Sequence, residues 1–418
     1  MKTSLSNLGL NIGFTMMVVL STGATMNSDK SPTLKDAYQN YFYVGAAINR
    51  AIAADAVRTG NRHRTVEQAV QDIALTKEQF NQISPENDLK WAMIHPREGA
   101  DGYDFGPADA YVAFGLKNHM YIVGHTLVWH GQTPGWVFAG TASPDAAANA
   151  PAAAPARPAN GAETNADEGW FGHGIDNSGP RATREELLRR MRNHIRTVVG
   201  RYKGKIKVWD VVNEAIADGG PNILRKSPWL QIIGPDFIAK AFEYAHEADP
   251  DAILRYNDYG LENPEKRKKL ITLIKDLQAQ KVPVMAIGTQ THVSVSSPTF
   301  EEEDRELTEL ETLGLPIHIT ELDVNSAQGG QRNNGADIAN NAETTRGGLV
   351  DDANQRLANQ YAALFKAFIK HKNSVKVVTL WGVNDGLSWR ADGKPLLFDS
   401  NDQPKPAFDA VIQAARGS

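Results

Sequence analysis

Two glutamates, each in or directly after an apolar run, are the residues of this sequence best suited to catalysis. Glu214 closes the run IKVWDVVNE, and Glu321 lies in the run IHITELDV. Hydrolysis of a sugar acetal needs two carboxyl groups, one protonated to assist the leaving oxygen and one ionised to attack or stabilise the oxocarbenium-like carbon. The two glutamates meet this need if the fold brings their side chains together.

The elements that must position these carboxyl groups are short apolar runs that alternate with amphipathic segments. The runs are residues 41–49, 80–86, 121–130, 206–214, 253–259, 285–293, 317–324 and 375–384, and the amphipathic segments include residues 184–199, 235–248, 265–280, 300–313 and 352–371. Most runs are rich in Val, Ile and aromatic residues without strict alternation, which is typical of strands buried on both faces in parallel sheets. Eight such units predict an α/β fold, a single (β/α)8 TIM barrel over residues 34–416. An open doubly wound sheet is the alternative, and the absence of a Gly-rich nucleotide loop after the first run disfavours it.

Two segments interrupt the alternation and are expected to be long loop insertions. Residues 139–180, after the third strand, begin with a tract rich in alanine and proline, and residues 325–351, after the seventh, are rich in Gly, Asn and Gln. The prolines forbid a continuous helix in the first segment, which also has few large apolar groups. Both loops would lie on the carboxyl-end face of the barrel, where they either shape one end of a cleft or are surface insertions without function.

Length, composition and charge restrict the class of protein. A chain of 418 residues with 41% hydrophobic and 22% charged residues is compatible with one large soluble barrel. The net charge of −5 argues against nucleic acid or an anionic membrane as the main partner. The absence of cysteine excludes a disulfide, a thiolate nucleophile and a cysteine metal site. We expect a monomer without a cofactor.

The N-terminus resembles an export signal. Lys2 precedes an apolar stretch over residues 8–20, and the small residues Thr-Gly-Ala follow at 22–24. This pattern predicts a secretory signal peptide over residues 1–25, and hence a secreted or periplasmic protein. An N-terminus that is not cleaved is the alternative, because only one cation precedes the apolar stretch. The stretch is too short for a stable membrane span.

Polar and aromatic residues gather where the predicted strands end. Seven of the eight runs end in Asn, Gln, His, Trp or a carboxylate. In a barrel, catalytic and binding groups lie at the carboxyl ends of the strands, so these residues would share one face. Aromatic rings can stack on sugar rings, and amide or charged side chains can pair with sugar hydroxyls. The pattern therefore predicts a polar cleft lined with aromatic residues.

Five motifs at these strand ends carry a specific resemblance. They are ENDLKW (86–91), GHTLVWH (124–130), WDVVNEA (209–215), GTQTH (288–292) and ITELD (319–323). Together they resemble glycoside hydrolase family 10, the family of retaining endo-β-1,4-xylanases, over residues 34–416. The resemblance implies a double displacement through a covalent glycosyl-enzyme, with Glu214 as general acid/base and Glu321 as nucleophile.

The expected geometry agrees with these roles. Retaining glycosidases place two carboxyl groups about 5–5.5 Å apart. At that range an ionised Glu321 raises the pKa of Glu214 and keeps it protonated near neutral pH. The alternative is that both are exposed carboxylates at the ends of strands.

Three further residues are predicted to serve the two carboxyl groups. Strand alternation puts Asp323 on the same face as Glu321. We expect His292 to hydrogen-bond Glu321 and to be oriented by Asp323, although a satisfied core histidine is the alternative. Asn213 and Glu214 can both enter the cleft only if the strand loses its regularity there, for example through a bulge. The resemblance makes Asn213 the partner of the sugar 2-hydroxyl, whereas a turn-forming Asn is the alternative.

The resemblance also assigns substrate-binding residues. On the glycone side they are Glu86, Asn87, Lys90, His125, Trp129, Gln290, Trp381 and Trp389, and on the aglycone side Asn257 and Tyr259. A surface ion pair between Glu86 and Lys90, and core filling by the tryptophans, are the alternatives. The histidines at the strand ends lack the i, i+4 spacing of a helical metal site, so no metal is expected.

The expected function is retaining endo-hydrolysis of β-1,4-xylosidic bonds in xylan and xylo-oligosaccharides. Hydrolysis of β-1,4-glucan or mixed glucan is the alternative, because the sequence does not fix the wall that would exclude the C6 hydroxymethyl group of glucose. Trp389 is the candidate for that wall. A non-catalytic glycan-binding barrel is a further alternative, which the presence of both Glu214 and Glu321 disfavours.

Overall fold

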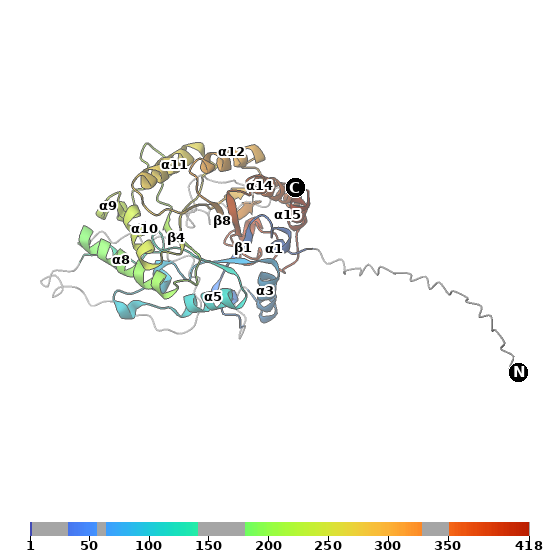
Figure 1. Ribbon diagram of the computed structural model, residues 1–418, viewed down its shortest axis with the longest axis horizontal. Helices are drawn as coiled ribbons and strands as arrows, with labels where there is room; N and C mark the ends of the chain where they lie inside the picture. The colour runs from blue at the N-terminus through green and yellow to red at the C-terminus, as the bar shows by residue number, and fades with distance from the viewer. Residues whose placement is uncertain (2–31, 57–63, 141–179, 328–350, 418) are drawn as a thin grey trace. The chain divides into compact units, whose positions relative to one another are not determined.

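Eight parallel strands close into a barrel, and helices surround them (Figure 1). This computed structural model describes residues 1, 32–56, 64–140, 180–327 and 351–417. Neighbouring strands follow the order β6-β5-β4-β3-β2-β1-β9-β8, and a pairing of β6 with β8 completes the ring. The predicted (β/α)8 TIM barrel is therefore confirmed, and an open sheet is excluded because the ring has no free edge.

The barrel strands coincide with the eight apolar runs. They are β1 (Tyr43–Ile48), β2 (Gln82–Pro85), β3 (Tyr121–Gly124), β4 (Val208–Asn213), β5 (Ile253–Asp258), β6 (Ala286–Thr289), β8 (Ile317–Asn325) and β9 (Val375–Leu380). Nearly every residue in them is buried. Burial on both faces explains why their sequences are continuous apolar runs rather than alternating patterns.

Two runs are shorter as strands than expected. The third run stops pairing regularly at Gly124, and only an isolated bridge of Val128 with Val212 follows. The sixth run stops at Thr289 because Thr291 has a left-handed backbone, with φ of 58°. His292 therefore belongs to a separate short strand, β7 (His292–Ser294), which pairs with β8 from Asp323 onward.

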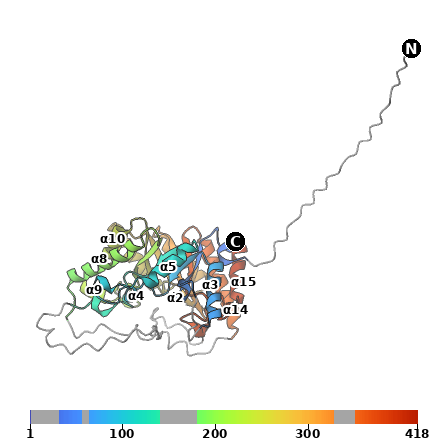
Figure 2. The ribbon, with the colours of Figure 1, turned by 90° about the horizontal axis from the view of Figure 1, so that it is seen from below.

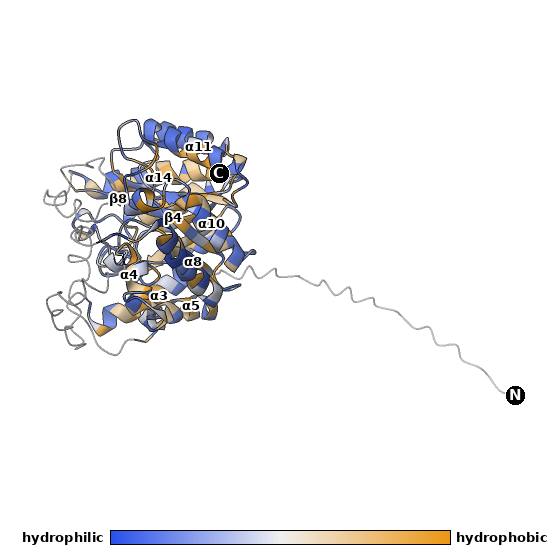
Figure 3. Ribbon diagram, turned by 90° about the vertical axis from the view of Figure 1, so that its left-hand side faces the viewer, coloured by the Kyte–Doolittle hydropathy of each residue, from blue (hydrophilic) through white to orange (hydrophobic). Residues whose placement is uncertain are grey.

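Helices form the outer layer, as the amphipathic segments predicted (Figures 1 and 2). The longer ones are α3 (Val66–Gln79), α5 (Gly106–Lys117), α8 (Arg184–Arg201), α10 (Phe237–Ala248), α11 (Pro264–Ala279), α12 (Phe300–Glu311), α14 (Ala353–Lys370) and α15 (Pro406–Arg416). The short ones are α1 (Leu34–Ala37), α2 (Arg50–Ala53), α4 (Trp91–Ile94), α9 (Pro228–Ile232) and the 3-10 turns η1 (Ala100–Gly102), η2 (Gly135–Val137) and η3 (Ala391–Gly393). The visible faces of α8 and α11 are hydrophilic (Figure 3), which suits helices that bury only one side against the barrel.

Side-chain caps fix where several helices begin. Thr65 and Thr299 form capping boxes at the starts of α3 and α12, and Thr183 caps α8 through the backbone N–H of Glu186. Such caps satisfy backbone N–H groups that have no partner inside the helix. Each cap therefore fixes the residue at which its helix begins.

A layer of charged groups fills the barrel interior beneath the strand ends. Arg255 donates from Nε and Nη2 to the two oxygens of Asp210, at 2.6 and 2.9 Å, and its Nη1 lies 3.0 Å from Nδ1 of His318. The pKa of Asp210 falls to about 2, because the charge of Arg255 and hydrogen bonds outweigh the opposing effect of burial. Asp210 also contacts Nδ1 of His125 at 2.9 Å. The layer thus orients a residue at the mouth of the barrel.

Three predicted features fall largely outside the described residues. They are the signal peptide (1–25) and most of the two loop insertions (139–180 and 325–351). Ala139 and Arg181, which flank the first insertion, are joined by an antiparallel bridge. Thr33–Ser418 forms one compact unit. No helix among the described residues is long and apolar enough to cross a membrane.

Candidate active site

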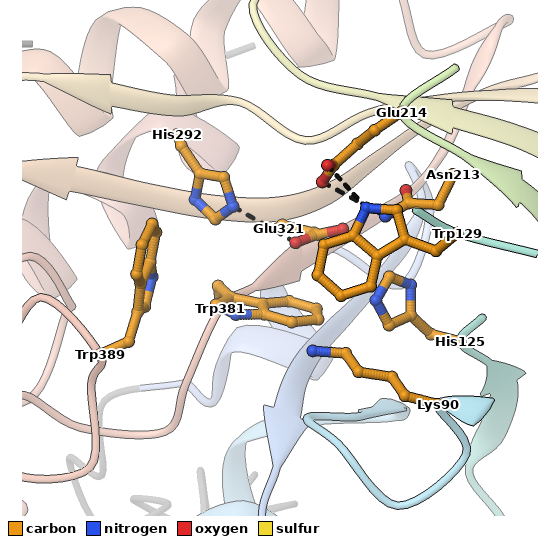
Figure 4. Close-up of a pocket in the computed structure, with 9 residues that line it drawn as sticks. All are labelled: Lys90, His125, Trp129, Asn213, Glu214, His292, Glu321, Trp381 and Trp389. Carbon is orange, nitrogen blue, oxygen red and sulfur yellow. Dashed lines mark hydrogen bonds and ion pairs between the residues drawn. The ribbon is translucent and has the colours of Figure 1, made fainter. Parts of the chain in front are cut away.

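One pocket at the carboxyl ends of the barrel strands collects most of the predicted site residues (Figure 4). Its lining consists of Lys90, His125, Trp129, Asn213, Glu214, His292, Glu321, Trp381 and Trp389. These residues come from the ends of six different barrel strands or the segments that follow them. The carboxyl groups of Glu214 and Glu321 both point into this pocket (Figure 4). The closed barrel is therefore what brings them together from distant parts of the chain.

The end of β4 deviates from a regular strand, as predicted, and this lets two consecutive residues reach the pocket. The pairing of β4 with β5 shifts its register between Asp210 and Val212. Glu214 then adopts a left-handed backbone, with φ of 57°. Such a conformation is uncommon for residues other than glycine and is found at functional sites. Asn213 and Glu214 therefore both face the cleft although they are neighbours in sequence.

A chain of amide side chains connects the two carboxyl groups. Oε1 of Glu214 accepts hydrogen bonds from Nε2 of Gln290, at 2.9 Å, and from Nδ2 of Asn213, at 3.3 Å. Nδ2 of Asn257 donates to Oδ1 of Asn213, at 2.9 Å, and to Oε1 of Glu321, at 2.8 Å. The relative positions of the two carboxyl groups are thus fixed by amide donors, which stay neutral and do not titrate.

Asn257 was expected to contact the aglycone, and its surroundings indicate a different task. The residue has no exposed surface, is not among the residues that line this pocket, and bonds Glu321 directly. Its Oδ1 accepts from Oγ1 of Thr320 at 2.7 Å, which fixes the direction of its amide. We therefore interpret Asn257 as a residue that holds Glu321 rather than one that contacts the sugar directly.

Glu214 is the carboxyl group of this pair with the raised pKa. Burial raises its pKa to about 7, and the negative charges of Asp258 and Glu321 act in the same direction. Hydrogen bonds from Gln290 and from Nε1 of Trp129, which lies 2.7 Å from Oε2, oppose the rise only partly. The direction agrees with the sequence-based expectation, but the cause differs. Burial is the main contribution, and Glu321 is not the leading charge.

Glu321 keeps its charge because its neighbour is a cation. Nε2 of His292 lies 3.3 Å from Oε2 of Glu321, and Nδ1 of His292 lies 2.9 Å from Oδ2 of Asp323. Burial would lower the pKa of His292, but Asp323 and Glu321 outweigh it and raise the pKa to about 9. Burial would also raise the pKa of Glu321, and the bond from His292 together with nearby histidine charges lowers it instead. His292 therefore lies between the two carboxylates with the contacts expected for it, and its raised pKa favours the imidazolium form.

Asp323 is held by two residues that follow β9. Nη1 of Arg390 donates to its Oδ1 at 2.9 Å, and Nε1 of Trp389 donates to its Oδ2 at 2.8 Å. The ring of Trp389 also stands edge-on to that of His292, with centroids 5.1 Å apart. Trp389 therefore lines the pocket and also contacts both His292 and Asp323, the residues that support Glu321. Sequence reasoning missed Arg390, although it directly follows Trp389 and is buried.

The opposite wall of the pocket carries a second group of predicted binding residues. Nζ of Lys90 donates to Oδ1 of Asn87 at 3.0 Å and lies 5.2 Å from the ring of Trp129. Lys90 is only 4% exposed, so it is not an ordinary surface residue. Glu86 and Asn87 are half-buried just before it. Gln132 also donates to Asn87, at 3.3 Å, and was not anticipated from the sequence.

Two other aromatic residues have distinct surroundings. Trp381 is 9% exposed and stands edge-on to the ring of His125, with centroids 5.4 Å apart. Tyr259 lies outside the pocket lining, where its hydroxyl contacts Asp218 and Nζ of Lys266 lies 3.2 Å from its ring centroid. Contact between Tyr259 and the aglycone remains a prediction.

Metal chemistry has no support at this site. Within the described part of the chain, no group of three or more His, Asp or Glu side chains could hold a metal ion. The nearby histidines instead pair with carboxylates, as His125 does with Asp210 and His292 with Asp323.

A closed (β/α)8 barrel with one carboxyl group of raised pKa and one of lowered pKa in the same pocket fits the chemistry of a glycoside hydrolase. The sequence profile of glycosyl hydrolase family 10 matches residues 33–159 and 163–414. This chain belongs to that family, the one its strand-end motifs resemble.

Similar proteins cover nearly the whole chain. A β-1,4-xylanase of Dictyoglomus thermophilum is 36% identical over 389 residues, which are 91% of this chain and 91% of the relative. The structure of an endoxylanase of the same family from a sugarcane soil metagenome has a TM-score of 0.72 and 34% identity, covering 92% of this chain and 99% of that one. An intracellular xylanase of Thermoanaerobacterium saccharolyticum, solved with xylotetraose, has a TM-score of 0.71 and 33% identity, covering 91% of this chain and 98% of that one.

The close approach of Gly288 to Asn257 generates a first prediction. A Cβ at Gly288 would lie 2.3 Å from Oδ1 of Asn257, so the variant Gly288→Ala must displace the amide that holds Glu321. We expect kcat on xylo-oligosaccharides to fall at least ~10-fold, because small misplacements of reacting groups are costly. The control is Gly45→Ala, whose Cβ would clash with Gln82 instead and should lower the melting temperature without lowering kcat of the folded enzyme. Unchanged kcat in Gly288→Ala would contradict the role of Asn257.

The protonation states generate a second prediction, on pH dependence. If Glu214 is the proton donor and Glu321 the nucleophile, kcat/KM on xylan should fall above about pH 7, where Glu214 loses its proton. At low pH, kcat/KM should begin to fall only below the ordinary pKa range of glutamate, because the pKa of Glu321 is lowered. A β-xylobioside with an acidic phenol as leaving group needs no proton, and its kcat/KM should lack the alkaline limb. The same alkaline limb for both substrates would contradict the assignment of Glu214.

Proposed function

We propose that this enzyme is an endo-1,4-β-xylanase that hydrolyses internal bonds of xylan with net retention of the anomeric configuration. The observation that carries the proposal is the pairing, in one pocket, of a carboxyl group with a raised pKa and a carboxylate with a lowered pKa. Family membership and the named xylanase relatives supply the substrate.

The first step would be formation of a glycosyl-enzyme. Glu321 attacks the anomeric carbon, while Glu214 gives its proton to the departing glycosidic oxygen. His292 keeps Glu321 ionised before the attack, and Asn257 holds one of its oxygens in place. Asn213 lies between the two carboxyl groups, where it can reach the sugar 2-hydroxyl, a contact that strengthens in the transition state.

The second step would reverse the roles of proton donor and acceptor. Once Glu321 is an ester, its negative charge is gone, and one of the charges that raise the pKa of Glu214 is removed. Glu214 then ionises more readily and can deprotonate the water that attacks the ester. The bonds from Gln290 and Trp129 keep its carboxylate oriented in both steps.

The aromatic and charged walls support recognition of a pentose chain. Trp129, Trp381 and Trp389 present ring faces or edges to the pocket, and Lys90 supplies a cation that can donate to hydroxyls. We propose that Trp389 restricts the space that a C6 hydroxymethyl group would occupy, because its ring is fixed against His292 and Asp323. A rigid wall selects better than a mobile one, since it cannot move aside for the larger sugar.

We also propose that the enzyme acts as a monomer and is exported through a signal peptide over residues 1–25. The pattern of Lys2 followed by an apolar stretch supports export. The intracellular relative from Thermoanaerobacterium means that family membership alone does not decide the location. The mass of the mature protein would show whether the segment is removed.

The function is tested by following the first products of xylan hydrolysis by proton NMR. The β-anomer should appear first and then mutarotate, and xylan should be cleaved faster than carboxymethyl-cellulose. The variant Glu321→Ala should lower turnover at least ~10³-fold while still binding xylan, because the nucleophile is lost. The control Glu301→Ala, an exposed residue on α12, should behave as wild type. An α-anomer first, or faster cleavage of cellulose, would contradict the proposal.

A further inference from the structure

A buried carboxylate next to the active site has no part in the mechanism above. Asp258, the last residue of β5, has no exposed surface and does not line the pocket. Its Oδ2 accepts from the hydroxyl of Tyr256 at 2.7 Å and from the backbone N–H of Ile216 at 3.1 Å. Its Oδ1 accepts from the N–H of Tyr259 at 3.0 Å and pairs with Nζ of Lys266 at 3.0 Å. Four donors converge on it, which is the environment of an ionised carboxylate.

The Asp258 carboxylate and its partner Tyr256 fix the backbone directly after Glu214. The hydroxyl of Tyr256 donates to Asp258 and accepts from the N–H of Ala215 at 3.0 Å. Asp258 itself holds the N–H of Ile216, the next residue. These are the N–H groups of the turn that begins at Glu214 with a φ of 57°. A non-glycine residue in a left-handed conformation costs on the order of 1–3 kcal/mol and persists only when its surroundings hold it there.

We propose that Asp258 is a positioning residue for the acid/base: through Tyr256 and Ile216 it holds the left-handed turn that aims the Glu214 carboxyl into the cleft, and it places a second carboxyl group beside that turn. The inference rests on the proposed function, since it assigns Asp258 a task only if Glu214 is the proton donor. The charge of Asp258 is the first of the two carboxylate charges that raise the pKa of Glu214, ahead of Glu321. The charge of Glu321 is lost when the glycosyl-enzyme forms, whereas the charge of Asp258 remains.

Other ionisable groups surround this pair and remain unchanged in Asp258→Asn. They face Glu214 or Asp258 from β5 and β8, from the segments after β3, β4 and β5, and from α11. They are Glu321, His130, Asp218, Arg225, Tyr256, Tyr259 and Lys266.

The experiment compares Asp258→Asn with wild type on two substrates across pH. On xylan, which needs a proton donor, kcat/KM should fall about 10-fold or more, within the range that general acid catalysis contributes. On a β-xylobioside with an acidic phenol as leaving group, kcat/KM should change little. The alkaline limb on xylan should also move to lower pH by about 0.5–1 unit, because one negative charge near Glu214 is lost.

Two companion variants separate position from charge. Tyr256→Phe removes the acceptor of the Ala215 N–H but keeps the carboxylate, so xylan activity should fall without a shift of the alkaline limb. Asp218→Asn removes an equal charge that also contacts Lys266. The N–H groups of Ala215 and Ile216 bond Tyr256 and Asp258 instead, and Asp218 is linked to the turn through Arg225, whose Nε donates to the carbonyl of Glu214. The alkaline limb of Asp218→Asn should stay at the wild-type position.

The outcomes are distinct. An unshifted alkaline limb in Asp258→Asn, or an equal loss on both substrates, overturns the inference. If Asp258→Asn does not fold, Tyr256→Phe decides the positional claim, because an equal loss on both substrates in that variant overturns it as well. Failure of the wild-type enzyme to cleave xylan would refute the proposed function instead, so the two failures cannot be confused.

Discussion

The constraint on which this structure depends is that two buried carboxyl groups in one pocket must differ in charge. Burial alone would neutralise both, and it opposes ionisation of Glu214 and Glu321 alike. The difference comes from their partners. Glu214 receives hydrogen bonds from neutral amide and indole donors, whereas Glu321 is joined to an imidazolium that Asp323 keeps charged. Because burial acts on both groups alike, the difference between their pKa values comes from the charges and hydrogen-bond donors around each one.

Barrel closure brings these partners together, and local departures from regular strands aim them. The register shift in β4 and the left-handed backbone of Glu214 direct that carboxyl into the pocket. Thr291 is also left-handed and ends β6, which places Gln290 against Glu214 and starts β7 at His292. Both irregular positions adjoin residues of the pocket. Their strain is held by neighbouring hydrogen bonds, of which those from Ala215 and Ile216 to Tyr256 and Asp258 are examples.

The sequence predicted the barrel because strands buried on both faces are continuous apolar runs. It predicted that Asp323 shares a face with Glu321 because side chains alternate along a strand, and that His292, from the preceding run, bridges the two. It did not predict the place of the Asn257 side chain. The direction in which that side chain points depends on neighbours such as Thr320 and Gly288, which are distant in sequence. The support from Arg390 and the charge of Asp258 also went unseen. Both act through contacts between segments that are distant in sequence, and the spacing of residues along the chain does not indicate such contacts.

The most direct test of the central claim is to titrate the two glutamates by carbon NMR of the enzyme labelled at its glutamate carboxyl groups. Variants with Gln at position 214 or 321 would assign the two signals. Glu214 should titrate near pH 7, and Glu321 should titrate below the ordinary glutamate range. Titration of both groups together in the ordinary range of an exposed glutamate would contradict it, because the pocket would then not distinguish its two carboxyl groups.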